Sequence, residues 1–213
     1  MTTDRERRLE EVLAQFIRPV RGIPFEVIIR SLCGVGVLAF DRAVDQNKAL
    51  LRQMVAAMRT ACATVRAKPI ERPRPNEVGN DMEPFVIAAL KAQGLDAAAP
   101  KTKGGLGKST GYPDLKITRA GPPLFVEVKT FATGTSHGTM RSFYLSPADD
   151  PKVHEEGMHL LVGFEMERTG NFYAPVAFEL VDLFGLECDM KSEFNSDNRR
   201  LYHLDRVLAR ERV

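Results

Sequence analysis

Two short stretches of alternating apolar and polar residues, joined by a turn, constrain this chain more than any other feature. Residues 114–117 read DLKI and residues 126–129 read VEVK, with the turn sequence RAGPP at 119–123 between them. Neighbouring side chains on a strand point to opposite faces, so each stretch has one apolar and one polar face. The sequence therefore predicts two short strands in a hairpin, with Val126 and Val128 in the core.

Such a hairpin would gather three charged side chains at one place. Asp114 near the start of the first strand would lie close to Glu127 and Lys129 near the end of the second. Two carboxylates side by side repel each other, and Mg²⁺ removes that repulsion because it prefers oxygen ligands. The ammonium could then hold a phosphate oxygen or orient a metal-bound water. The alternative is a surface hairpin with a charged outer face, in which Lys129 simply pairs with a carboxylate.

These residues resemble the signature of the PD-(D/E)xK nucleases, the restriction-endonuclease-like superfamily. Pro113 and Asp114 match its first half, and residues 127–129 (EVK) match its second half. The resemblance covers residues 77–178 and implies an α/β fold with a mixed central sheet flanked by helices. It further implies that Asp114, Glu127 and the Val128 carbonyl bind Mg²⁺, while Lys129 positions the attacking water or stabilises the transition state.

Members of this superfamily commonly contribute one more acidic residue from the helix before the motif. A helix capped by Asn80 or Asp81 is expected here, with Pro84 in its first turn, where backbone N–H groups lack an intrahelical partner. Glu83 matches the acidic position best, and Glu77 is the second candidate. Alternatively, Glu83 only complements the helix dipole.

The segments around the motif are candidates for contact with DNA. Residues 101–110 form a lysine-rich loop expected to touch phosphates, or alternatively a solvated loop without a ligand. The polar segment after the motif is expected to read bases, since arginine can bind guanine with two hydrogen bonds, and a strand is expected at 142–145. The candidate DNA-binding residues are Lys103, Lys108, Ser109, Thr110, Tyr112, Thr130, Ser136, His137, Arg141 and Ser142.

A nucleotide cofactor is not expected, although residues 107–109 (GKS) match the end of a Walker A loop. The first glycine of that motif would fall at Thr102, and a strand follows instead of a helix.

The remaining pattern predicts two regions. Residues 1–70 are interpreted as a helical N-terminal subdomain that either forms a dimerisation surface or covers the sheet, and residues 71–213 as the nuclease core, with residues 67–76 as a linker. Helices are predicted at 4–17, 24–34, 45–66, 179–186 and 205–212, and a hairpin is predicted from strands at 159–167 and 172–178.

Composition narrows the class of protein. The net charge of +2 over 213 residues neither requires nor excludes a nucleic acid partner, but residues 101–131 carry six basic and two acidic side chains, which suits a polyanion. Cys33, Cys62 and Cys188 lie far apart, which argues against a zinc site or a disulfide framework and fits the cytoplasm. The charged N-terminus and the interrupted apolar run at 23–40 predict neither a signal peptide nor a membrane span.

The sequence looks most like a type II restriction endonuclease, which would act as a homodimer on a specific double-stranded DNA sequence with Mg²⁺. Two alternatives stay open. The first is a repair or junction-resolving nuclease of the same superfamily, and the second is a DNA-binding protein without catalytic activity.

Overall fold

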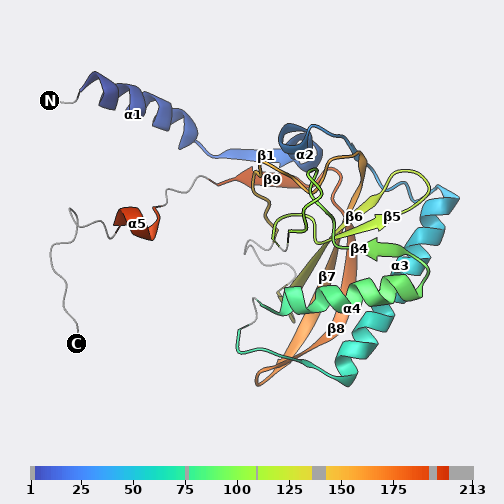
Figure 1. Ribbon diagram of the computed structural model, residues 1–213. Helices are drawn as coiled ribbons and strands as arrows, with labels where there is room; N and C mark the ends of the chain where they lie inside the picture. Colours follow the sequence, from blue (N-terminus) through green and yellow to red (C-terminus); the bar gives the residue numbers. More distant parts are fainter. Residues whose placement is uncertain (1–2, 75–76, 109, 136–142, 192–195, 202–213) are drawn as a thin grey trace, which may run out of the picture. The chain divides into compact units, whose positions relative to one another are not determined.

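The computed structural model describes residues 3–74, 77–108, 110–135, 143–191 and 196–201 (Figure 1). The chain forms two compact units, one made of residues 24–186 and the other of residues 1–23 together with 187–213. The larger unit contains the motif residues.

A mixed sheet is the centre of the larger unit. Its order is β3 (Ile70–Glu71), β8 (Phe172–Asp182), β7 (Gly157–Thr169), β6 (Leu124–Ala132), β5 (Leu115–Thr118) and β4 (Asp96–Ala98), and β2 (Val37–Leu38) pairs with β7. The β6–β7 and β2–β7 pairs are parallel, and the other pairs are antiparallel. Strand β6 therefore lies inside the sheet, between β5 and β7.

Helices α3 (Asp45–Ala67) and α4 (Val78–Ala92) pack together on one face of this sheet (Figure 1). Met54 and Met82 from these helices share a buried cluster with Val126 and Val162 from the strands. Because side chains alternate along β6, Phe125 points to the opposite face. There it packs in a second cluster with residues of α2 (Phe25–Cys33).

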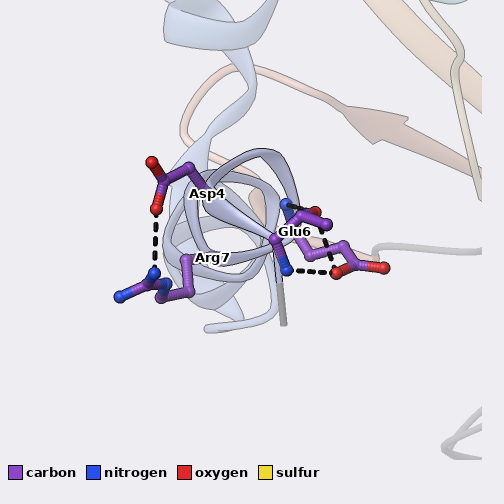
Figure 2. A network of polar contacts seen from close by, with 4 residues as sticks. Asp4, Glu6 and Arg7 are labelled. Atoms are coloured by element: carbon purple, nitrogen blue, oxygen red, sulfur yellow. Dashed lines mark hydrogen bonds and ion pairs between the residues drawn. The ribbon is translucent and has the colours of Figure 1, made fainter. Parts of the chain in front are cut away.

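The smaller unit contains α1 (Asp4–Phe16), β9 (Glu187–Met190), α5 (Asn198–Leu201) and all but the last residue of β1 (Val20–Pro24), which pairs with β9 in a two-stranded sheet. Helix α1 begins with a capping box, in which Thr3 and Glu6 bond each other's backbone N–H groups (Figure 2). Asp4 and Arg7 add an ion pair at 2.8 Å in the same turn. The helix start is thus fixed locally, although α1 has no buried residue.

The mixed α/β class is confirmed, as are the motif hairpin, the β7–β8 hairpin and the first three predicted helices. Helix α4 begins at Val78, earlier than expected, so that Pro84 lies inside the helix and not in its first turn. The burial of Met82 and Val86 on either side of Pro84 explains why the helix continues through a residue that lacks an N–H donor.

Two other predictions of secondary structure are wrong. The helix predicted at 179–186 is absent, because β8 continues to Asp182 in register with β7 and a turn follows. Residues 143–145 form no strand, and residue 142 and the helix predicted at 205–212 lie outside the described residues. Within the described part of the chain, no helix combines the length and the apolar character that crossing a membrane requires.

Candidate active site

The register of the β5–β6 hairpin brings Asp114 to Glu127. Leu115 pairs with Val126 and Ile117 with Leu124, so one further step of the antiparallel register sets Asp114 opposite Glu127. The Oδ2 atom of Asp114 also accepts a hydrogen bond of 2.8 Å from the backbone N–H of Val128. The carboxylate of Asp114 is therefore fixed against the middle of β6.

Glu127 is buried, although its charge would favour exposure to water. Its residue surface is 4% exposed, and its Oε1 accepts a hydrogen bond of 2.5 Å from Lys129 Nζ. Its other oxygen, Oε2, is buried and has no hydrogen-bond partner among the described residues. Burial, followed by the nearby charge of Asp114, raises the pKa of Glu127 to about 7, while Lys129 acts in the opposite direction.

Lys129 is paired as the surface-hairpin interpretation anticipated, but its setting is not that of an exposed hairpin. Its side chain is 27% exposed, while the carboxylate it contacts is almost completely buried. Its ammonium also lies 5.8 Å from the centre of the Tyr144 ring. The ammonium of Lys129 is thus held against Glu127, while part of its side chain is exposed to solvent.

The pKa of Glu83, which lies in α4, is shifted by charges of the same group of side chains. Burial raises its pKa to about 7, and the charge of Asp114 adds to this effect. Lys152 and Lys129 lower the pKa of Glu83, as expected for ammonium groups close by.

The other candidate on this helix, Glu77, has a different partner. Its carboxylate lies 3.8 Å from the guanidinium of Arg72, and Arg72 also binds Asp81 through two hydrogen bonds of 2.6 and 2.7 Å. Glu83, whose pKa is raised first by burial and then by the charge of Asp114, is therefore the acidic residue of this helix that acts together with the motif.

Lys152 is a member of this group that the sequence pattern did not reveal. It is 5% exposed, and its Nζ donates hydrogen bonds to the carbonyl oxygens of Gly111, at 2.7 Å, and Pro113, at 3.1 Å. Burial lowers its pKa, while the carboxylates of Asp114, Glu127 and Glu83 act to raise it. No signal in the sequence points to it, since residues 149–154 (DDPKVH) match no motif and show no strand or helix period.

The expected DNA-binding residues have different surroundings. Lys103, Lys108 and Thr110 are exposed, in agreement with a loop that faces solvent. Thr130 is half-buried. Its hydroxyl faces Gly79 of α4, where an added Cβ would lie 3.8 Å away from it. Five other expected contacts, Ser109, Ser136, His137, Arg141 and Ser142, lie outside the described residues.

Tyr112 belongs to an aromatic cluster on the α2 face of the sheet. Its ring stacks on His159 with 5.8 Å between ring centres, and its hydroxyl lies 2.6 Å from His159 Nδ1. Its ring also meets Phe25 edge to face. Burial lowers the pKa of His159 to about 3, so this imidazole is neutral at pH 7.

The donor set suits a hard divalent cation. Asp114 and Glu127 provide carboxylate oxygens, and a cation would satisfy the buried Oε2 of Glu127 that has no protein partner. Across the described residues, no three side chains of the types His, Cys, Asp and Glu are grouped so that they could hold an ion together. An ion at Asp114 and Glu127 would therefore need further oxygens from backbone carbonyls and water, which Mg²⁺ commonly uses.

Comparison with known proteins gives two matches. The model of the type II restriction enzyme MjaV family matches residues 19–205. The type II restriction enzyme MjaV of Methanocaldococcus jannaschii is 33% identical over a match that covers 94% of this chain and 94% of that protein. No solved structure matches this chain.

Proposed function

The chain belongs to the type II restriction enzyme MjaV family and is a restriction endonuclease; from this premise, we propose that it cleaves one specific DNA sequence with Mg²⁺ held by Asp114 and Glu127. Family membership points to a divalent metal cofactor and to double-stranded DNA as the bound partner. The observation that carries the assignment to these two residues is the buried Glu127 carboxylate beside Asp114, with one oxygen unpartnered.

The metal ligands would be the carboxylates of Asp114 and Glu127 and the carbonyl oxygen of Val128. When bound, Mg²⁺ supplies positive charge for the phosphate oxygens and increases the acidity of a coordinated water. Asp114 is held ready for this role by its hydrogen bond from the Val128 N–H. Glu83 would complete the acidic site by holding a metal-bound water.

Lys129 would act on the attacking water or on the charge that develops at the phosphate. Its ammonium is anchored to Glu127 and its side chain is partly exposed, which supports a role toward a substrate that does not require it to leave the carboxylates. A charge already fixed in this position needs little reorganisation during the reaction, and this favours the transition state.

DNA contacts are proposed for the loops on either side of the hairpin. The exposed Lys103 and Lys108 suit contacts with phosphates, which are electrostatic and independent of sequence. Arg141 is proposed to contact a base. The same general role is proposed for Ser109, Thr110, Tyr112, Thr130, Ser136, His137 and Ser142.

A homodimer in the cytoplasm is also proposed. Two strands must be cut in duplex DNA, and one chain carries one set of Asp114, Glu127 and Lys129. Leu9, Val12 and Leu13 of α1 are 52%, 48% and 38% exposed and offer an apolar surface to a second copy. The three cysteines are free, which agrees with a reducing compartment.

Digestion of plasmid DNA tests this proposal. Purified protein with Mg²⁺ should give a fixed set of fragments, excess EDTA should prevent cleavage, and Asp114→Ala should abolish it while the thermal unfolding transition persists. Smears, or cleavage confined to branched DNA, would contradict sequence-specific restriction. Wild-type cleavage by Asp114→Ala at limiting Mg²⁺ would contradict the metal assignment alone.

A further inference from the structure

Lys152 occupies a place in which a lysine is rarely found. It belongs to the stretch between β6 and β7 that forms neither helix nor strand in residues 143–156, and it is 5% exposed. Val153, the next residue, is 1% exposed and packs in the cluster on the α2 face. Burying an ammonium costs free energy unless it is hydrogen-bonded, so a lysine here requires specific partners.

Both hydrogen bonds that Lys152 donates end on one short turn. The acceptors are the carbonyl oxygens of Gly111, at 2.7 Å, and Pro113, at 3.1 Å. Pro113 directly precedes Asp114, whose carboxylate is bonded to the Val128 N–H at 2.8 Å. Lys152 thus holds the backbone just before Asp114, and the backbone of β6 holds the carboxylate of Asp114.

We propose that Lys152 is a positioning residue, which fixes the turn of residues 111–113 so that the Asp114 carboxylate is set in place to bind the metal. This inference rests on the metal role of Asp114 given above. Groups that orient a metal ligand from behind usually affect metal affinity strongly, although they do not touch the ion.

A role of Lys152 in charge balance alone would change the metal affinity in the opposite direction, so the two roles can be distinguished by experiment. If Lys152 only balanced the charge of the neighbouring carboxylates, removing its ammonium would strengthen the binding of a cation. If it only supported the fold, its loss would lower the melting temperature without changing metal affinity in the folded protein.

The experiment measures Mn²⁺ binding, by calorimetry and by electron paramagnetic resonance, for wild type, Lys152→Met and Lys152→Arg. Positioning predicts weaker Mn²⁺ binding in both variants, by roughly 10-fold or more. The methionine has no donor, and the planar guanidinium cannot replace a compact buried ammonium between two carbonyl groups. Lys48→Met, which removes a lysine from an exposed ion pair with Asp45, should bind Mn²⁺ as the wild type does.

The outcomes separate the inference from its premise. Tighter binding in Lys152→Met, or wild-type binding in a folded Lys152→Arg, would overturn the inference, and the arginine variant decides alone if Lys152→Met does not fold. Asp114→Ala serves as the reference for the metal site. If Asp114→Ala binds Mn²⁺ as the wild type does, the proposed metal role of Asp114 fails, whatever the Lys152 variants show.

Discussion

At the scale of single residues, the charged form of Glu127 is unfavourable in the protein without a bound metal. Its carboxylate is buried beside Asp114, one oxygen is bonded to Lys129, and the other has no partner among the described residues. Its pKa of about 7, against an ordinary value of 4.5, expresses the cost of its charge in this place. Binding of a cation would lower the free energy of such a site, because it would stabilise the buried charge of Glu127.

The first prediction concerns the pH dependence of stability. Between pH 4.5 and about 7, folded Glu127 holds its proton more tightly than unfolded Glu127 does. Stability contributed by this group is therefore complete below the unfolded pKa and is lost as the pH rises through the folded pKa. Over this window the stability contributed by Glu127 and Glu83 should fall as the pH rises, whereas the stability contributed by His159, whose pKa is lowered, should rise. Glu127→Gln should therefore make the slope of the melting temperature against pH more positive than in the metal-free wild type. An unchanged slope in that variant would contradict the raised pKa.

A second prediction distinguishes catalysis by Lys129 from simple ion pairing. Lys129→Ala should reduce the single-turnover cleavage rate far more than the affinity for DNA, because its contribution is larger in the transition state than in the ground state. Lys129→Arg should not restore the rate, since a planar, permanently charged group differs from an ammonium in shape and proton chemistry. An exposed ion pair would be worth only ~0–1 kcal/mol and would tolerate arginine, so rapid cleavage by Lys129→Arg would exclude the catalytic role.

The grouping of the charged residues on the hairpin could be predicted from the sequence, but the position of Lys152 beside them could not. Asp114, Glu127 and Lys129 could be grouped because strand alternation and one hairpin register relate their positions directly. Lys152 reaches the same place from a segment without regular structure, where no period relates sequence to direction. The extent to which Glu127 is buried also depends on β7, which follows β6 after a long connection and pairs with it in parallel.

At the scale of elements, the start of β7 fits tightly against the start of β6. A Cβ at Gly157 would lie 2.7 Å from the Pro123 carbonyl oxygen and 2.9 Å from a carbon of the Phe125 ring. Neither neighbour can withdraw easily, because one is backbone and the other is a completely buried ring.

A third prediction follows from this close contact. Gly157→Ala should lower the free energy of unfolding by about 1–3 kcal/mol, the usual effect of overpacking a core. Chemical denaturation measures it, and Gly107→Ala, at which a Cβ would meet no atom within 4 Å, is the matched control. Equal stability of the two variants would show that β7 can move away from β6.

Two of the elements that sequence patterns predicted wrongly share a physical cause. The segment 179–182 was expected to be helical, yet it extends β8 because Glu179 pairs with Gly163 and Asp182 with Leu160 across the hairpin. Helix α4 begins ahead of its expected cap because Val78 and Met82 are buried in the core. In both places tertiary pairing or burial outweighs the local preference that the sequence displays.

At the scale of the whole molecule, restriction of duplex DNA requires two cuts, and one chain offers one candidate site. Helix α1 has no buried residue, and its sequence places Leu9, Val12 and Leu13 along one stripe. Three large apolar side chains in adjacent turns cost free energy in water, and contact with the same helix of a second copy would remove them from it.

The final prediction tests that surface. Sedimentation of the wild-type protein should give the mass of a dimer, about twice the 23.7 kDa of one chain. Leu9→Asp combined with Leu13→Asp should shift the protein towards the monomer, because charges in an apolar interface lose hydration without gaining partners. Glu11→Ala, on the opposite side of the helix, should leave the mass unchanged. A dimer that survives the double substitution would place the interface elsewhere, and a monomeric wild type would contradict the homodimer itself.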